Sequence, residues 1–258
     1  MIQKYFVKVR FGIFNDMEKT VTEAIHHRRS VRIFRSDVEL DSTIVKQCIE
    51  NAVLAPTSSN LQLWEFYHIT DTDTLEQMTK ACLGQNAAKT AKQMVVVVAR
   101  KDLWRKRAKA NLDFLKSVYG DKPEKEYSGR EKFALNYYKK LIPSVYFDFL
   151  GIFGWLKYLI FQIIGIFKPT YRQVRQSDMR IVAQNRAGLA AQNFMISMAA
   201  LGYDTCAMEG SDTLMVKRIL GLPNRAEINM VIGCGVRDKK GVYGPRFRVP
   251  FNDIYKKM

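Results

Sequence analysis

Six consecutive apolar residues, from Met94 to Ala99, limit the fold of this chain more than any other feature of its sequence. A strand exposed on one face alternates apolar and polar residues, whereas a strand buried on both faces is apolar throughout. The run Ile228–Ile232 is predicted to be a second buried strand. The chain must therefore cover both faces of a sheet with helices, which predicts an α+β fold.

Apolar residues at helical spacing identify the elements that would cover this sheet. Helices are predicted at 17–28, 41–54, 75–83, 183–201 and 213–220, and two further strands at 65–69 and 205–208. Gly202 and Gly221 are expected to end the last two helices. The tail, 241–258, contains three glycine or proline breaks and is expected to be extended. These segments fit one domain over 1–258, with an insertion at about 101–176 that is first basic and then apolar.

The net charge of +16 favours anionic partners, such as phosphorylated cofactors, nucleic acid or an anionic membrane surface. Because no RNA- or DNA-binding motif is present, nucleic acid is not expected as a partner. The four cysteines are widely spaced, which argues against a disulfide framework or a zinc site. Scattered cysteines, and no secretory signal in Met1–Phe14, predict a cytoplasmic protein.

Two segments carry arginines that suit an anionic ligand, because a guanidinium fork matches phosphate oxygens. The first segment, 27–34, follows a predicted helix and contains Arg28, Arg29, Ser30 and Arg32. In the second, 244–250, the alternate residues Arg246 and Arg248 point to the same side of an extended chain. Alternatively, the first cluster is only a solvated helix end that complements the helix dipole.

Two further segments offer polar contacts of low steric demand. The turn 55–64 precedes a predicted strand and contains Pro56, Thr57, Ser58 and Asn60. This turn could bond the edge of a flat polar heterocycle, or it could simply join a helix to a strand. The segment 206–212 ends a predicted strand and contains Met208, Glu209 and Gly210. Its glycine lets backbone N–H groups approach a ligand, but Ser211 or Asp212 could equally cap the next helix.

Together and in this order, the four segments resemble those of the FMN-dependent nitroreductase family, which includes flavin reductases and related dehalogenases. The resemblance covers about 28–100 and 177–250 and leaves out the insertion. It implies a nitroreductase-like fold with a central mixed β-sheet and a C-terminal extension that wraps the partner subunit. It also implies a homodimer with FMN bound at each of two subunit interfaces.

The resemblance further implies where the cofactor lies. Arg28 and Ser30 would contact its phosphate or ribityl group, and Arg32 the N1/O2 edge of the isoalloxazine. The turn 55–64 would reach the flavin of the other subunit, the Glu209–Gly210 backbone would face flavin N5, and the C-terminal arginine pair would close on the phosphate. The implied cofactor-binding residues are Arg28, Arg29, Ser30, Arg32, Pro56, Thr57, Ser58, Asn60, Gln85, Met208, Glu209, Gly210, Arg246 and Arg248.

Two departures from the family pattern affect this site. Leu63 stands where the family commonly has the proline of a Gln-Pro-Trp motif. Many members also place a lysine shortly before the third strand, beside flavin O2. The matching region of this chain leaves Gln85, Asn86 and Lys89 as alternatives for that position.

The activity implied by the resemblance is an NAD(P)H-dependent oxidoreductase. Hydride would pass from NAD(P)H through flavin N5 to a nitro-aromatic, a quinone or a similar small electron-poor acceptor, in a ping-pong cycle. No catalytic side chain and no metal are expected, because the cofactor carries the chemistry. One alternative is an FMN enzyme that performs reductive dehalogenation or dehydrogenation. Another is a non-catalytic basic module that binds membrane surfaces or nucleic acid.

The apolar part of the insertion, 141–168, approaches the length of a bilayer span but is interrupted by Asp148, Lys157 and Gln162. The leading interpretation is a lid, or an arm that wraps the dimer. Five aromatic residues would then shape the acceptor pocket: Tyr146, Phe147, Phe149, Phe153 and Trp155. The alternative is an interfacial helix in peripheral contact with a membrane, its flanking cations on anionic lipid, which would make the protein membrane-associated.

Overall fold

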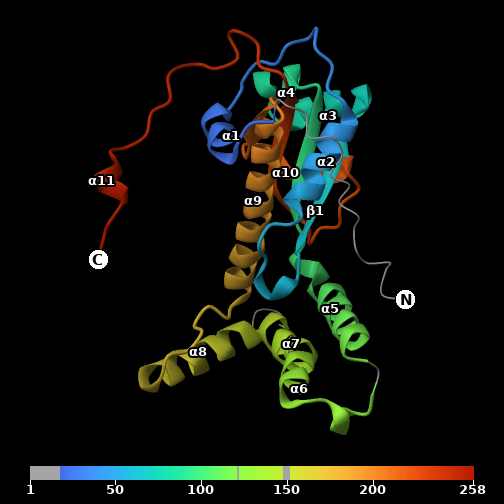
Figure 1. Cartoon of the computed structure of the whole chain (residues 1–258), viewed down its shortest axis with the longest axis vertical. Coiled ribbons are helices and arrows are strands. Elements are labelled where there is room, and N and C mark those ends of the chain that lie inside the picture. Colours follow the sequence, from blue (N-terminus) through green and yellow to red (C-terminus); the bar gives the residue numbers. More distant parts are fainter. Residues whose placement is uncertain (1–17, 121, 148–151) are drawn as a thin grey trace.

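A computed structural model describes residues 18–120, 122–147 and 152–258. A sheet forms the centre of the molecule, with helices on both of its faces and the helices of the insertion beyond one end (Figure 1). The predicted α+β class is therefore confirmed. The start of the first predicted helix, at Met17, lies outside the described residues.

The sheet has four strands in the order β1-β2-β4-β3. The strands are β1 (Trp64–Ile69), β2 (Gln93–Ala99), β3 (Asp204–Met208) and β4 (Glu227–Gly235). All three neighbouring pairs are antiparallel, and a single parallel bridge joins Ser30 to Thr205. The expectation of a mixed sheet is thus corrected for the four described strands, because every hydrogen-bonded pair of neighbouring strands among them is antiparallel.

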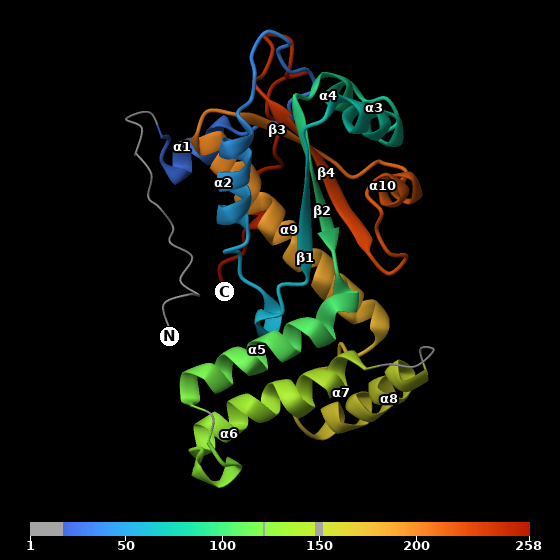
Figure 2. The same ribbon diagram turned by 90° about the vertical axis from the view of Figure 1, so that its right-hand side faces the viewer.

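The central strand β2 is buried on both faces, as its composition predicts. Its alternate side chains Val95 and Val97 pack in a cluster with helices α2 (Ser42–Ala52) and α9 (Gln176–Ala200). Val96 and its neighbours of the opposite parity pack in a second cluster, with helices that include α3 (Thr72–Ala81) and α10 (Thr213–Ile219). Figure 2 shows α2 and α9 on one side of the strands and α3 and α10 on the other.

The helices differ from the predictions mainly at their boundaries. The short helix α1 (Val21–His27) begins later than predicted and is capped by Thr20. The long helix α9 begins seven residues before the predicted start at Ala183. Gly202 has the expected positive φ of 84° at its end. Helix α4 (Asn86–Thr90) was not predicted, because five residues are too few to show a helical period.

The four cysteines are all buried and free. Burial raises the pKa of the Cys82 thiol to about 11 and that of the Cys48 thiol to about 12. These thiols are therefore small apolar core residues at neutral pH, as their scattered positions predict.

The insertion forms a helical layer beyond one end of the sheet (Figure 2). Its main elements are α5 (Trp104–Tyr119), α6 (Gly129–Asn136), the π-helical turn η4 (Tyr137–Leu141), α7 (Ile142–Tyr146) and α8 (Ile152–Phe167), with short 3-10 turns η2 (Lys101–Leu103) and η3 (Glu124–Glu126). Lys157 turns its ammonium group to the carbonyl oxygens of Ser144, Val145 and Phe147 at the end of α7. Within the described ranges, no helix has both the length and the apolar character that a bilayer crossing requires.

The C-terminal tail leaves the sheet after Gly235 and runs away from the body of the molecule (Figure 1). It is extended, as predicted, except for the short helix α11 (Phe251–Ile254). The side chains of Phe251, Ile254 and Tyr255 are exposed, with 51–68% of their surface open to solvent. An extended arm with exposed apolar groups is consistent with the expectation that it wraps a partner subunit, which stays a prediction.

Candidate functional site

The two arginine segments of the sequence meet in the fold. A cavity of about 340 Å³ lies between them, lined by Arg28, Arg29, Ser30, Arg32 and residues 242–248. The guanidinium of Arg246 donates to the carbonyl oxygens of His26 and Arg28, at 2.9 and 2.6 Å. Its hydrogen bonds cap the end of α1 and fix the tail across it.

The same tail is fixed at two further points. Arg29 donates from Nη2 to the carbonyl of Gly244 at 2.6 Å, and the backbone N–H of Arg32 donates to the carbonyl of Gly241 at 2.6 Å. A Cβ at position 241 would lie 2.4 Å from the carbonyl oxygen of Ile33, so only glycine permits this approach. These hydrogen bonds fix the tail against the 28–32 segment, so the arginines of the cavity are held in defined positions.

Like charges dominate the cavity. The pKa of Arg28 is lowered, first by burial and then by the neighbouring charges of Arg246, Arg248 and Arg29. Among the described residues no carboxylate forms an ion pair with any of these four guanidinium groups. An anion in the cavity would relieve this repulsion, and a phosphate offers the oxygen geometry that several guanidinium forks need.

An ion pair between the buried Asp204 and the partly exposed Arg237 fixes the end of α1, which directly precedes the arginine cluster. Asp204, only 3% exposed, accepts hydrogen bonds from the backbone N–H and Nε of Arg237 at 2.8 and 2.9 Å. Nη2 of Arg237 also donates to the carbonyl of His27, the last residue of α1, at 2.8 Å. Burial, and then the charge of Arg237, lower the pKa of His27. His27 is therefore a neutral group at neutral pH, hydrogen-bonded to Arg237 at the end of α1.

The Glu209–Gly210 pair lies directly after β3, the edge strand that also carries the bridge to Ser30. Both residues are exposed, whereas the side chain of Met208 is buried in the core, so Met208 can offer only its backbone to a ligand. Asp212 caps α10 by accepting from the N–H groups of Leu214 and Met215 at 3.0 Å. Asp212 is therefore the cap of α10, which was one of the two interpretations of this segment. The backbone of Glu209 and Gly210 takes no part in the cap and stays available to a ligand.

Of the three alternatives for the lysine position, Gln85 contacts the Glu-Gly turn. Its Nε2 donates to the carbonyl of Gly210 at 2.8 Å. Asn86 instead donates to the hydroxyl of Tyr243 in the tail at 3.0 Å, and Lys89 is exposed. Tyr243 also lines the arginine cavity, and sequence reasoning missed it because nothing in its local pattern marks an extended tail residue that folds back.

The predicted turn 55–64 does not meet the other three segments within one chain. It precedes β1, and β1 and β3 are opposite edges of the sheet. Trp64, at the start of β1, pairs with Ala99 of β2, and Ala99 pairs with Glu227 of β4. Thr205 of β3 pairs with Cys234, near the other end of β4. Seven residues of β4 separate these two levels, which is about 24 Å at 3.4 Å per residue.

The turn itself is held in an unusual backbone conformation by the insertion. Ser59, Asn60 and Gln62 have positive φ values of 53°, 49° and 47°. Asn111 of α5 donates to the carbonyl of Asn60 at 2.9 Å, and the hydroxyl of Tyr138 donates to the carbonyl of Ser59 at 3.0 Å. Such conformations persist only where neighbours fix them, and they concentrate at binding sites. The insertion therefore shapes this turn, which the sequence alone did not indicate.

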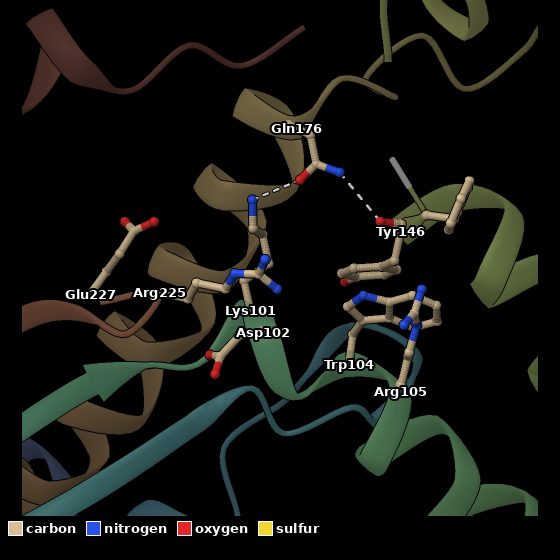
Figure 3. Close-up of a pocket in the computed structure, with 9 residues that line it drawn as sticks. Lys101, Asp102, Trp104, Arg105, Tyr146, Gln176, Arg225 and Glu227 are labelled. Carbon is tan, nitrogen blue, oxygen red and sulfur yellow. Dashed lines mark hydrogen bonds between the residues drawn. The ribbon is translucent and has the colours of Figure 1, made fainter. Parts of the chain in front are cut away.

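Two cavities lie where the insertion joins the sheet. One, of about 400 Å³, contains Lys101, Trp104 and Tyr146 (Figure 3). Trp104 stacks on Tyr146 with ring centroids 5.8 Å apart, and Gln176 links Lys101 to the Tyr146 carbonyl by hydrogen bonds of 2.7 and 3.3 Å. These contacts join α5, α7 and α9, and the carboxylates of the lining, Asp102 and Glu227, are paired with Arg100 and Arg180.

The other cavity, of about 590 Å³, lies beside the 55–64 turn and includes Ser58 and Ser59 in its lining. Tyr146 also lines this cavity. Phe147 lines the first cavity, and Phe153 and Trp155 lie exposed on α8, so the part of these three in an acceptor pocket stays a prediction. Phe149 lies outside the described residues.

These features define an α+β protein with an arginine-lined cavity on one sheet edge and a strained polar turn on the other. The family model named Nitroreductase family matches residues 25–236, and the chain belongs to this family. Its members are FMN-dependent oxidoreductases.

The chain is similar to protein DrgA of Synechocystis sp., with 29% identity over 216 residues that cover 83% of each chain. It is 24% identical to an oxygen-insensitive NADPH nitroreductase of Helicobacter pylori, over 87% of this chain and 90% of the relative. In fold it is similar to the ydfN protein of Bacillus subtilis, with 24% identity, a TM-score of 0.69, and coverage of 92% of this chain and 98% of that one. A protein from Exiguobacterium sibiricum, solved in complex with FMN, has a TM-score of 0.64 at 21% identity, with coverage of 93% and 98%.

Inorganic phosphate is expected to stabilise the protein through the arginine cavity. At a tenfold excess over Kd the gain is about 1.4 kcal/mol, or roughly 3–6 °C in Tm for a chain of this size. The substitution Arg248→Ala should abolish most of this shift, and the exposed Arg218→Ala on α10 should not. Thermal melts in phosphate and in chloride at equal ionic strength measure the effect. A phosphate shift that survives in Arg248→Ala would place the anion elsewhere.

Proposed function

We propose that this chain is an FMN-dependent NAD(P)H oxidoreductase that reduces nitro-aromatics, quinones or similar electron-poor acceptors. The observation that carries the proposal is the placement of the arginine cavity and the Glu209–Gly210 turn along the same edge strand. An elongated ligand with an anionic end and a flat polar end fits this arrangement. The relatives named as nitroreductases support the same activity.

The residues of the chain fit the cofactor in chemical type. Arg28, Arg246 and Arg248 would hold the phosphate, and Arg29 and Ser30 line the same cavity. Arg32, which also lines the cavity, would place a fixed cation beside the pyrimidine edge of the ring. When bound, the flavin supplies the hydride-transfer chemistry.

The remaining roles belong to the turn after β3. The exposed backbone of Glu209 and Gly210 offers N–H groups without side-chain obstruction, since a Cβ at position 210 would meet nothing nearer than Gln85 Nε2 at 4.0 Å. Gln85, bonded to the Gly210 carbonyl, would fix this turn and present its amide to the ring. Reductive dehalogenation or dehydrogenation would use the same residues, and no feature of the described residues favours either over nitro or quinone reduction.

The proposed function predicts that the purified protein binds FMN and that NADH or NADPH bleaches its absorbance without oxygen. Arg248→Ala should weaken FMN binding about tenfold, because one charge-assisted contact to the phosphate is lost. Riboflavin, which lacks the phosphate, should bind wild type and variant equally. Fluorescence titration with both ligands measures this, and Arg218→Ala is the control.

A protein that binds neither flavin would contradict the proposed function, and the basic cavity would then belong to a non-catalytic binding module. Equal loss of FMN and riboflavin in Arg248→Ala would mean that the arginine supports the fold of the tail and not the phosphate.

We also infer that the working form is a homodimer. The 56–60 turn is strained and polar, yet it lies on the opposite edge and the opposite end of the sheet from the arginine cavity. A second copy could bring its own turn, with Pro56, Thr57, Ser58 and Asn60, to the flavin held by the first. The extended tail offers a means to hold the two copies together.

The dimer predicts a mass of about twice 29.8 kDa by light scattering of the full chain. FMN affinity should fall on dilution into the monomer range, because each flavin would lose the turn of the partner. A monomer that retains full FMN affinity would refute the shared site.

The outer face of α8 supports a further proposal, that this helix lies against a lipid surface of negative charge. Its bulky residues Trp155, Leu159, Ile163 and Phe167 are 56–83% exposed at helical spacing. The helix contains no acidic residue, and exposed cations flank it at Lys139, Lys140, Lys168 and Arg172. An apolar face with basic flanks is typical of interfacial helices.

The full chain is therefore expected to co-sediment with vesicles that contain phosphatidylglycerol more than with vesicles of phosphatidylcholine alone. The double substitution Leu159→Glu with Ile163→Glu should abolish this, because two carboxylates would enter the apolar layer. Leu214→Glu, on the exposed face of α10, is the matched control. If the wild type does not bind vesicles and the double variant loses the mass of the dimer, the outer face of α8 is a contact between subunits.

A further inference from the structure

The cavity of about 590 Å³ beside the 55–64 turn has walls from three parts of the chain. Ser58 and Ser59 form one wall, the insertion forms the second with Tyr137, Tyr146 and Phe161 among others, and helix α9 forms the third. The hydroxyls of Ser59 and Tyr137 are 2.6 Å apart, so the turn and the insertion wall are bonded to each other. The cavity is thus lined mostly by aromatic and aliphatic groups and has room for a small flat molecule.

A single charged group faces this space. Among the described residues that line the cavity, Arg186 of α9 is the only ionisable side chain other than tyrosine. Its Nε is buried and has no hydrogen-bond partner within the described part of the chain. A buried donor of a charged group is costly to leave unsatisfied, and an apolar surrounding increases that cost.

The neighbours of Arg186 do not neutralise it. Asp178, on the same helix, is paired with Arg175. Tyr146 lies within electrostatic range of Arg186, but burial raises its pKa to about 12, so its phenol stays neutral. The negative or strongly accepting group that Arg186 needs is therefore not supplied by the lining of the cavity.

We propose that this cavity binds the electron acceptor and that Arg186 selects acceptors that carry a carboxylate or a similar anionic group on a flat apolar body. The guanidinium fork matches a carboxylate, and the tyrosine and phenylalanine walls match an aromatic or conjugated body. This inference rests on the proposed function, because the Ser58–Ser59 wall is the segment expected to reach a flavin. Arg186 is then a specificity-determining residue and takes no part in the redox step.

Two acceptors of nearly equal shape separate charge recognition from general binding. 4-Nitrobenzoate carries a carboxylate, and 4-nitrobenzamide carries a neutral amide at the same position. The ratio of kcat/KM for the acid to kcat/KM for the amide is expected to fall at least tenfold in Arg186→Gln. Arg186→Lys, which keeps the charge but loses the fork, should fall between the two. Arg180→Gln is the control, since Arg180 lies on the same helix, is exposed, and pairs with Glu227 outside this cavity.

Two readouts keep this inference separate from the proposed function. Anaerobic bleaching of the wild type by NADPH tests the flavin half-reaction by itself, because no acceptor is present. Calorimetry of 4-nitrobenzoate binding to the full chain needs no redox activity, and Arg186→Gln should weaken it by the same factor. If bleaching fails in wild type while the binding difference remains, the proposed function is lost and the anion site stands.

An unchanged acid-to-amide ratio in a variant that bleaches normally would overturn the inference. An equal loss of kcat/KM for both acceptors would also overturn the inference, and so would equal 4-nitrobenzoate binding by wild type and Arg186→Gln. In either case Arg186 does not recognise the carboxylate.

Discussion

The burial of β2 on both faces is the constraint on which the rest of the structure depends. Because its side chains of both parities are apolar, one helix layer must pack on each side, and the strand must lie inside the sheet. β1 and β4 take the two positions beside it, and β3 lies beyond β4. The edges of the sheet are therefore β1 and β3. The 55–64 turn leads into β1, the Glu209–Gly210 turn follows β3, and the 28–32 segment bridges to β3.

The edge position of β3 explains how a strongly cationic site is built. An edge strand leaves backbone groups unpaired on one side, and the 28–32 segment uses them through the Ser30–Thr205 bridge. Asp204 and Arg237 fix the end of α1 beside it, and the tail is fixed by backbone contacts at Gly241 and Gly244. The repulsion among the arginines is thus opposed by contacts that do not neutralise them, and their charge stays available to a ligand. Like charges that are held together without neutralising partners are expected at a functional site.

Sequence reasoning succeeded where the signal is local. The strands followed from apolar runs, the helix ends at Gly202 and Gly221 from glycine at a left-handed position, and the arginine cavity from the spacing of arginines in two segments. It failed where the signal is short or distant. Helix α4 is too brief to show a period, and α9 starts earlier because its first turns pack on the insertion. Tyr243 and Arg186 carry no local mark, because each becomes part of a cavity only through contacts with remote segments.

The sequence by itself determined the fold class, the central strand, the family and the residue types of the arginine-lined cavity. These properties depend on hydrophobic period, turn chemistry and charge spacing, which are local to a segment. Only the tertiary structure decided that the 55–64 turn lies at the opposite edge and end from the arginines, that Gln85 meets Gly210, and that Arg186 faces an apolar cavity. These properties depend on the order and register of strands far apart in the chain. The free energy that fixes that order comes from packing of whole layers, which no single segment encodes.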